Sequence, residues 1–437
     1  MMKVAPVSRL LLVLGLVGGA LLPTSAAHAG GIQLWELGTP DVGLAAAGWS
    51  ARAQDAATLF KNPAGMNQLE VPQLEVGLQL GYGQFGFEAG NGTTVPGNNG
   101  GNPVGLIPGG SLFWAQQVTD VVAVGVGVFS YFGSALSFDE GFVGRYNVEE
   151  TLLVGFSLMP AVSFQITDWF ALGAGFNIML GIFDFKEAVN NPGPMVPDGR
   201  LALNDTDVGF GADVGVLFSI KEKTRLGVTY LSPVKLKFDL PTNFSGLGPI
   251  LSASLGMSGL LNSTIGMQIK VPQSLVLSAY HDFNEKWALM GNLGWQNWKQ
   301  FGLVGITVAA ENTQSLTVDR QYKDTAHVAI GTRFAPIPKA ILSLGFAYDS
   351  SAVADENRTV DAPLGQAFRF GVGVEWVIVP AVDLGLAYEL AWLGDMSVNQ
   401  QGGPLNGDVV GYYDNTGIHF IALSLQWNIG AKKDPDG

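Results

Sequence analysis

From Leu74 onward the chain is built from stretches of about ten residues in which apolar side chains alternate with glycine, alanine, serine or polar ones. In residues 381–392, for example, Val382 and Leu384 share one face, whereas Asp383 lies on the other. A period of two places alternate side chains on opposite faces of a β-strand. One face then suits lipid and the other suits an interior of small or polar groups, which predicts membrane-spanning strands.

Helices do not offer another way of crossing a membrane, because after residue 29 no apolar run reaches the roughly 18 uncharged residues that a spanning helix needs. Charged residues make up only 14% of the chain and its mean hydropathy is +0.27, a combination that soluble proteins seldom have. Main-chain polar groups in lipid must be satisfied within the protein. A closed β-barrel remains as the expected fold.

The first 29 residues have the pattern of a secretory signal peptide. Two basic residues precede the apolar run 10–22, and the small-residue end Ala27-His28-Ala29 follows it. We therefore expect residues 1–29 to be removed and the mature chain to begin at Gly30. Removal lowers the basic residues from 23 to 21 against 37 acidic ones, so that nucleic acid is not an expected partner.

The connections between the strands alternate in length, as in bacterial outer-membrane barrels with short periplasmic turns and long extracellular loops. The short turns fall at residues 118–120, 166–168, 221–224, 282–286, 335–339 and 379–381. The long connections fall near residues 88–110, 133–150, 186–204, 239–261, 302–321, 350–365 and 394–415.

Seven long and six short connections join fourteen strands, provided that Thr264 to Phe283 is one strand with Pro272 at a bend or bulge. Splitting that strand would give fifteen. The expected fold is an all-β membrane protein, a 14-stranded antiparallel transmembrane β-barrel over residues 71–430 with a C-terminal tail at 431–437. The expected location is the outer membrane of a Gram-negative bacterium.

Residues 30–70 lack the alternation and are rich in alanine and glycine, which predicts short helices and turns. Asp55 to Phe60 forms a plausible helical turn that stops at Asn62, because Pro63 disfavours the helical region in the residue before it. An apolar segment of this size ahead of a barrel can lie in the periplasm or in the lumen. Its composition favours a plug, or hatch, of short helices in the lumen.

The hatch segment resembles the FadL family of outer-membrane transporters for long-chain fatty acids and aromatic hydrocarbons. The resemblance covers residues 43–69, centred on the hallmark Asn62-Pro63-Ala64-Gly65-Met66 and preceded by Asp55-Ala56. Further matches are residues 271–301, with the tryptophan pair Trp295 and Trp298, and residues 347–353. The resemblance extends through most of the mature chain.

The resemblance implies a fourteen-stranded barrel closed by an N-terminal hatch. Extracellular loops first hold an apolar ligand, an apolar pocket then binds it, and the hatch N-terminus shifts. The ligand leaves sideways at an inward kink of the third strand, here Val121 to Phe132, where glycines permit a kink. The candidate ligand contacts at the hatch N-terminus and in the pocket are Ile32, Leu34, Trp35 and Phe129.

A candidate capture loop follows residue 246. Leu247, Leu251 and Leu255 recur at helical spacing, and exposed apolar loops invite apolar ligands. The other candidate capture residues are Ile250, Met257 and Leu261. The alternative is a loop helix that packs onto the barrel rim.

Other candidate residues also have a structural interpretation beside the functional one. Residues 62–66 can be a turn that seats the hatch, and the tryptophan pair can belong to an aromatic girdle. Arg333 and Arg369 face the lumen by parity, so either could hold a ligand carboxylate. Neighbours such as Glu375 or Asp383 could instead neutralise them.

The expected function is passive uptake of hydrophobic compounds, such as long-chain fatty acids or hydrocarbons. The alternatives are a water-filled porin for polar solutes and a surface adhesion or binding protein. An enzyme, such as a barrel lipase using His327, has little support, because no nucleophile-elbow or metal-ligand spacing occurs. No cofactor or metal is expected.

The expected partners are small hydrophobic molecules, outer-membrane lipid and lipopolysaccharide, and the barrel-assembly machinery, and the protein is expected to be a monomer. Barrels of this kind usually end on an aromatic residue that the assembly machinery reads. Here Trp427 is followed by ten further residues, so that either the tail lies beyond a strand ending near Ile429 or it weakens the terminal signal.

Overall fold

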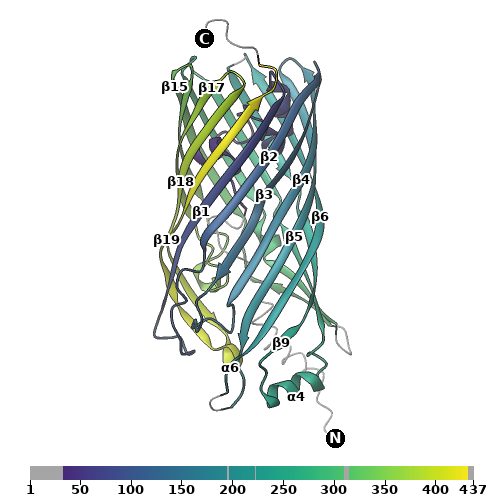
Figure 1. Ribbon diagram of the computed structural model, residues 1–437, viewed down its shortest axis with the longest axis vertical. Helices are drawn as coiled ribbons and strands as arrows, with labels where there is room; N and C mark the ends of the chain where they lie inside the picture. Colours follow the sequence, from purple (N-terminus) through teal and green to yellow (C-terminus); the bar gives the residue numbers. More distant parts are fainter. Residues whose placement is uncertain (1–32, 194–195, 222, 310–313, 432–437) are drawn as a thin grey trace.

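The computed structural model describes residues 33–193, 196–221, 223–309 and 314–431, and within them the chain forms a closed antiparallel barrel of fourteen strands (Figure 1). Backbone pairing runs from β1 through β6 and returns to β1 through β19. The predicted signal peptide, Gly30 to Ile32 of the predicted hatch and the end of the C-terminal tail lie outside the described residues.

Ten of the fourteen strands are continuous. They are β1 Gln73–Ala89, β2 Gly105–Thr119, β3 Val122–Ser137, β4 Glu150–Thr167, β5 Phe170–Val189, β6 Gly199–Ile220, β16 Ala340–Asp349, β17 Ala367–Val379, β18 Val382–Gln401 and β19 Asp408–Asn428.

Each of the other four strands is broken in two. The pairs are β7 Thr224–Leu231 with β8 Val234–Pro241, β11 Ser274–Asp282 with β10 Thr264–Val271, β12 Trp287–Gln296 with β13 Leu303–Ala309, and β15 Thr325–Ile337 with β14 Gln314–Asp319. Two breaks coincide with Pro233 and Pro272, which cannot donate a main-chain hydrogen bond to a ladder. The strand expected from Thr264 to Phe283 thus counts as one of the fourteen, but it is interrupted at Pro272, where its two halves enter different sheets.

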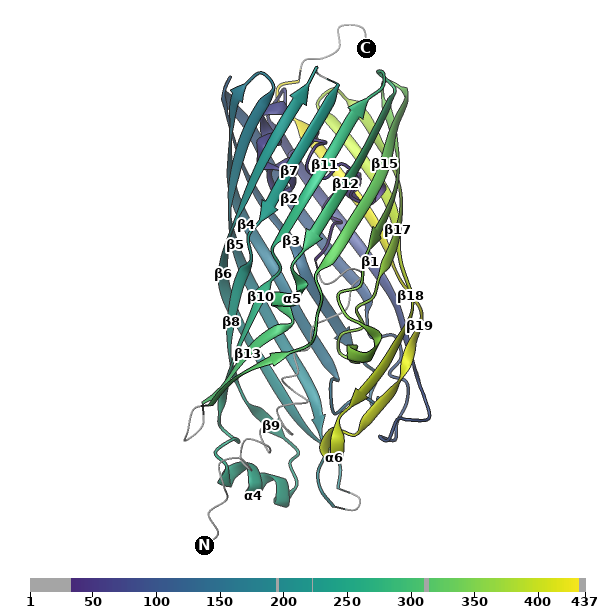
Figure 2. The ribbon, with the colours of Figure 1, turned by 180° about the vertical axis from the view of Figure 1, so that it is seen from behind.

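Beyond the breaks, β8, β10, β13 and β14 form a separate four-stranded sheet, which we call the outer sheet (Figure 2). Its apolar side chains point the opposite way from those of β7, β11, β12 and β15, which continue the same strands on the other side of the breaks. In β7 the exposed side chains include the apolar Leu226 and Tyr230, whereas in β8 they include Lys235 and Lys237. Most apolar side chains of β8, β10 and β13 are buried instead, and Leu316 and Val318 of β14 are partly buried. This inversion places an apolar surface toward the barrel interior at the end that carries the long loops.

At the level of the breaks the strands are joined by side chains, together with a main-chain hydrogen bond from Asn297 to the carbonyl of Gln273 at 2.9 Å. The Tyr230 hydroxyl donates to Gln273 (2.7 Å), and the amide of Gln273 donates to Asn297 (3.3 Å). Asn297 and the Trp295 indole N–H both donate to Asp324, at 2.8 and 3.1 Å. Four neighbouring strands thus stay connected where their ladders stop.

The wall extends further beyond the lipid than the apolar alternation predicted. The expected loops at 302–321 and 394–415 are wrong in part, because β13 and β14 occupy most of the first and β18 and β19 run into the second. In β18 the outward side chains here are polar, as at Ser397, Asn399 and Gln401. A strand whose outward face meets water has lost the apolar alternation that identified it.

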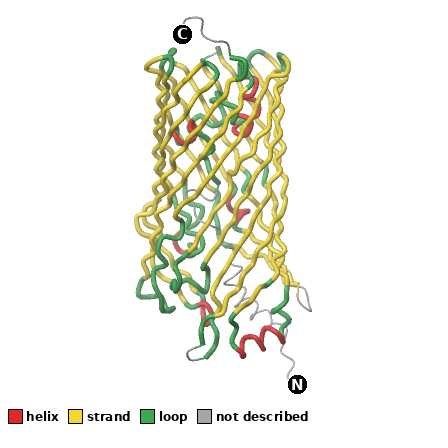
Figure 3. The backbone as a smooth tube through the Cα atoms, viewed as in Figure 1, coloured by secondary structure: helices red, strands yellow, loops and turns green. Residues whose placement is uncertain are grey.

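The hatch lies inside the barrel near the end with the short turns (Figure 3). It contains the short helices α2 Thr39–Gly43 and α3 Thr58–Lys61 and the 3₁₀ helix η1 Pro63–Gln68. The helix α3 ends before Asn62, as Pro63 requires. No helix among the described residues is long and apolar enough to cross a membrane.

The Asn62 side chain fastens the hatch to the wall. Its Nδ2 donates to the carbonyls of Ser50 (2.7 Å) and Val216 in β6 (2.9 Å), and its Oδ1 accepts from the backbone N–H of Ala64 (3.1 Å). Close approach is possible because Gly215 in β6 and Gly173 in β5 lack side chains. A Cβ at Gly215 would collide with Asn62 Oδ1, and one at Gly173 would collide with the Ala64 backbone N.

Four buried charges hold the hatch together internally. Asp41 pairs with Arg52 and, at 3.2 Å, with Lys61, which also reaches Asp55 at 3.0 Å. Burial raises the pKa of Asp55, but the Lys61 and Arg52 cations offset this and leave its pKa below the ordinary value. Burial lowers the pKa of Lys61, whereas Asp41 and Asp55 outweigh it and raise that pKa. These shifts favour the charged forms of Asp55 and Lys61, and within the cluster two acidic side chains face two basic ones.

Changing Gly215 to alanine is expected to loosen the hatch without opening the barrel ladder, because the added Cβ displaces Asn62 and breaks two of its hydrogen bonds to carbonyls. Hydrogen exchange should speed up in residues 39–68 by roughly tenfold or more, since each hydrogen bond is worth about 1 kcal/mol. The control is Gly266→Ala in β10, where the nearest atom to an added Cβ is 3.6 Å away. Unchanged exchange in Gly215→Ala would contradict this seating.

Changing Lys61 to methionine leaves Asp41 and Asp55 with Arg52 as their remaining cation in the hatch. Breaking a buried ion pair from one side costs about 3–5 kcal/mol, so the hatch should become sensitive to added protease while the barrel stays resistant. Lys186→Met is the matched control, because Lys186 pairs with Glu150 where both side chains are nearly half exposed. Equal proteolysis of the two variants would refute the role of the buried charges.

Candidate ligand-binding site

The third strand is irregular where the sequence analysis expected a kink. The β2–β3 ladder runs from Thr119 and Val122 to Ser111 and Phe129 and ends there. Beyond that point β2 continues on β1 as far as Gly105, and β3 continues on β4 as far as Ser137. The register of β3 on β4 shifts between Ser130 and Phe132, so that Tyr131 forms a bulge. We call the unpaired stretch between β2 and β3 the wall gap.

The start of the described hatch lies against this bulge. The backbone N–H of Leu34 donates to the carbonyl of Tyr131 at 2.7 Å, and Gln33 pairs with Phe132 as an isolated antiparallel bridge. We call residues 33–36 the N-terminal segment. Ile32, the preceding candidate contact, lies outside the described residues. The N-terminal segment thus forms main-chain contacts with β3 at the wall gap.

The other end of the N-terminal segment is held by charges and by rings. Glu36 pairs with Arg369 of β17, and the Trp35 ring stacks on His327 of β15 at 4.3 Å between centroids. Trp35 also meets Trp49 of the hatch edge to face at 5.0 Å. The segment therefore spans the lumen between the wall gap and the opposite wall.

Arg369 lies at the centre of a buried charge cluster. Besides Glu36 it donates to Asp349 of β16 at 2.6 Å and to Glu389 of β18 at 2.9 Å. His327 Nδ1 lies 2.7 Å from the other oxygen of Asp349. Sequence reasoning placed Arg369 on the lumenal face but did not identify these partners. The alternation of side chains along β16 and β18 also places Asp349 and Glu389 on the lumenal face. No local sequence pattern, however, links the hatch residue Glu36 to β17.

Arg333 has the neighbour that the sequence analysis named. Its guanidinium donates to Glu375 of β17 at 3.1 Å. The other expected neighbour, Asp383, instead accepts from the Asn428 side chain at 2.8 Å. Both arginines thus have carboxylate partners from the wall or the hatch.

A row of aromatic rings links the N-terminal segment to the wall gap through the hatch. From Trp35 and Trp49 it continues to Phe60 of α3 at 6.2 Å. Phe60 lies 4.5 Å from Phe129 and 4.9 Å from Tyr131, both on β3. Phe129, a candidate pocket residue, is buried, as the alternation of side chains along the third strand predicted.

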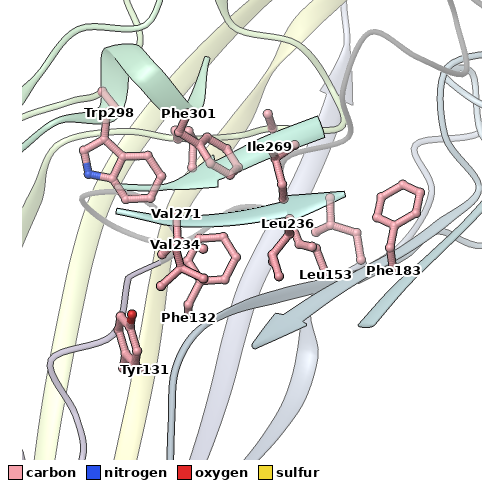
Figure 4. Packing of buried hydrophobic residues seen from close by; sticks show 14 of the residues in the cluster. Tyr131, Phe132, Leu153, Phe183, Val234, Leu236, Ile269, Val271, Trp298 and Phe301 are labelled. Atoms are coloured by element: carbon pink, nitrogen blue, oxygen red, sulfur yellow. The ribbon is translucent and has the colours of Figure 1, made fainter. Parts of the chain in front are cut away.

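Beyond the hatch, the apolar face of the outer sheet and the inner faces of β3 to β5 gather into one apolar cluster (Figure 4). Side chains far apart in the sequence meet here, and the figure labels Phe132, Leu153, Phe183, Val234, Leu236, Ile269, Val271, Trp298 and Phe301. We call this set the inner apolar cluster. Its members come from β3 to β5, from the outer sheet and from the short helix α5 Trp298–Phe301 between β12 and β13, so sequence alternation alone could not assemble it.

The candidate capture loop forms a helix, α4 Pro249–Met257, at the end with the long loops. Leu251 and Leu255 are buried, whereas Ile250 and Met257 are 67% and 78% exposed. Leu261 packs half-buried against the apolar core. The helix thus packs through one face and presents two large apolar side chains to the outside.

Comparison with known proteins identifies relatives over nearly the whole chain. Residues 20–427 match a family described as outer membrane protein transport protein (OMPP1/FadL/TodX). A long-chain fatty acid transport protein of Escherichia coli O6:H1 is 24% identical over 409 residues, covering 85% of this chain and 89% of the relative. A 47 kDa outer membrane protein of Pasteurella multocida is 25% identical, covering 83% and 88%.

Solved structures show the same fold. A FadL homologue of Pseudomonas aeruginosa superposes with a TM-score of 0.80 at 19% identity, covering 91% of this chain and 99% of that one. The toluene transporter TbuX of Ralstonia pickettii gives a TM-score of 0.66 at 16% identity, covering 90% and 99%. With the family match spanning residues 20–427, the chain belongs to the OMPP1/FadL/TodX family of outer-membrane transport proteins.

Proposed function

We propose that this protein takes up small hydrophobic molecules by passive diffusion and releases them sideways through the wall gap between β2 and β3. The observation that carries the proposal is the position of the N-terminal segment. Leu34 bonds to the backbone of Tyr131 at the place where the β2–β3 ladder has ended.

The wall gap suits lateral release because the β2–β3 ladder is interrupted along it, and main-chain bonding resumes at its far end, where the N–H of Ser137 donates to the carbonyl of Pro103 at 2.8 Å. Lipid-exposed sheet edges are costly, and the part of β2 nearest the long loops reduces this cost at Pro108, which has no N–H to donate. A ligand at this position needs to displace only side chains and the N-terminal segment, not an antiparallel ladder.

The hatch body is a less suitable exit. For it to leave the lumen, its hydrogen bonds to the wall would have to be broken, among them those of Asn62 to the Val216 carbonyl, of the Thr229 hydroxyl to the Lys61 carbonyl and of Asn292 to the Ala46 carbonyl. The ties of the N-terminal segment to the wall are the Leu34 hydrogen bond, the Gln33 bridge, the pair of Glu36 with Arg369 and the stacking of Trp35 on His327. Movement of this segment alone is therefore the less costly change.

The candidate residues take distinct roles in this proposal. Ile250 and Met257 of α4 offer an exposed apolar surface for capture, with Leu251, Leu255 and Leu261 anchoring the helix. The inner apolar cluster holds the ligand, and Leu34, Trp35 and Phe129 contact it beside the wall gap. Arg333 and Arg369 hold the wall and the hatch together through their carboxylate partners, and Asn62 to Met66 seat the hatch.

Uptake of radiolabelled dodecane and dodecanoate by cells that lack their own proteins of this family tests the transport function. Cells that produce this protein should accumulate label faster than cells with the empty vector. Reconstituted protein should show no steady conductance in planar bilayers, whereas a water-filled porin would conduct. Open-channel conductance without faster uptake would refute hydrophobic transport.

The Gln33→Cys/Phe132→Cys double variant tests the role of the N-terminal segment. An antiparallel bridge brings Cα atoms to about 4.5–5.5 Å, which suits a disulfide, and the chain has no other cysteine. Uptake should fall severalfold in the oxidised variant and recover after reduction, because the crosslink holds the segment across the wall gap.

The single Gln33→Cys variant, oxidised and reduced in the same way, is the control. Full uptake by the crosslinked double variant would show that the segment need not move. Uptake that stays low after reduction would indicate damage by the substitutions themselves, and a Gln33→Ser/Phe132→Ser variant would identify that damage.

A further inference from the structure

Three polar side chains lie close together on the inner wall beside the wall gap. They are Tyr131 at the β3 bulge, Asn177 of β5 and Asp213 of β6, and all three are buried. Asn177 Nδ2 donates to the Tyr131 hydroxyl at 3.1 Å. Asn177 and Asp213 lie on adjacent strands one diagonal step apart, because Asn177 pairs with Gly211 and Asp213 with Gly175, and both side chains are buried on the lumenal face. We call these three residues the polar triad.

Two oxygen atoms of the polar triad have no partner. Asn177 Oδ1 and Asp213 Oδ2 are buried and accept no hydrogen bond in the described part of the chain. A buried polar atom without a partner is energetically unfavourable, and such atoms in folded proteins call for an explanation. A bound ligand that donates hydrogen bonds would supply one.

The surroundings of the triad are apolar and lie on the proposed path. The Tyr131 ring is 4.9 Å from Phe60 and 5.9 Å from Phe129, between centroids. Asp213 is the last residue of β6 to pair with β7, where the outer sheet departs from the wall. The triad thus lies between the inner apolar cluster and the wall gap, with the Leu34 contact on Tyr131 itself.

The charge at the triad excludes one class of ligand head group. Among the described residues no cation acts on Asp213. The two cations of the hatch, Arg52 and Lys61, are paired with Asp41 and Asp55. An ionised carboxylate placed here would be buried beside an acidic residue without a counter-charge, which is strongly unfavourable.

A hydroxyl group fits the same atoms. It donates one hydrogen bond to Asp213 Oδ2 or Asn177 Oδ1, accepts another from Tyr131 or from a protonated Asp213, and brings no charge. Its apolar remainder then lies among the aromatic rings. We propose that the polar triad binds the hydroxyl group of an apolar alcohol or phenol, so that the transporter prefers such molecules to ionised carboxylates of the same length.

This proposal rests on the proposed transport of hydrophobic molecules and names the substrate class. Its test is isothermal titration calorimetry of the full mature protein in nanodiscs at pH 7.5, with empty nanodiscs as the blank. The probes are 1-octanol, octanoate, and 1-methoxyoctane, which keeps the oxygen but lacks the O–H donor. Octanoate is ionised at this pH, because carboxyl groups titrate near pH 4.

The protein should bind 1-octanol about tenfold more tightly than 1-methoxyoctane or octanoate, the ratio expected for one well-placed hydrogen bond. Asp213→Leu should remove the preference for 1-octanol while leaving the affinity for 1-methoxyoctane. Asp213→Asn should keep the preference, because its amide oxygen still accepts. Asp184→Leu on the outward face of β5 is the matched control and should behave as the unchanged protein.

Equal binding of 1-octanol and 1-methoxyoctane, or tighter binding of octanoate, would overturn the proposal. So would an unchanged preference in Asp213→Leu that runs as a folded barrel on unheated gels. If Asp213→Leu does not fold, loss of preference in Asn177→Leu decides in its place. Uptake of dodecane without any alcohol preference would sink this inference and leave the proposed transport intact, whereas failure of all uptake would sink the transport itself.

Discussion

The structure depends on one constraint, that main-chain N–H and C=O groups within lipid must find partners in the protein. Fourteen strands meet it by closing a ladder, and the departures from that ladder are local. β2 and β3 separate beyond Ser111 and Phe129. Four neighbouring strands are also broken, two of them at Pro233 and Pro272. At both places side chains or the hatch take over the contacts, and both places border the inner apolar cluster.

The hatch shows how packing and charge act together inside such a wall. Glycines at 173 and 215 let its backbone approach the strands, and Asn62 then bonds to the carbonyl of Val216. Its four buried charges balance one another within the hatch itself. The hatch body is therefore held together by its own ion pairs. The N-terminal segment, in contrast, is held by separate contacts with Tyr131 and Arg369 of the wall.

The charge cluster around Arg369 and the polar triad differ in a way that bears on function. Arg369 has carboxylates from the hatch and from two strands, so its charge is already matched. Asp213 faces no described cation and has an oxygen without a partner. In an apolar lumen, Arg369 with its carboxylate partners is suited to holding the hatch and the wall together, whereas Asp213 with its unpartnered oxygen is suited to binding a ligand.

The sequence by itself determined the barrel, its fourteen strands, the hatch and the lumenal side of Phe129, Arg333 and Arg369, because a two-residue period and the spacing of turns are local properties. Only the tertiary structure decided which side chains from distant segments meet, because the alternation along a strand gives the face of a side chain but not its partners. Glu36 meets Arg369 across 333 residues, and the partners of Asp349 and Glu389 come from neighbouring strands and the hatch. The outer sheet was missed in part because its outward residues meet water, which erases the apolar alternation. Contacts between distant segments depend on closure of the sheet and on where the hatch lies within it, and no local pattern encodes either.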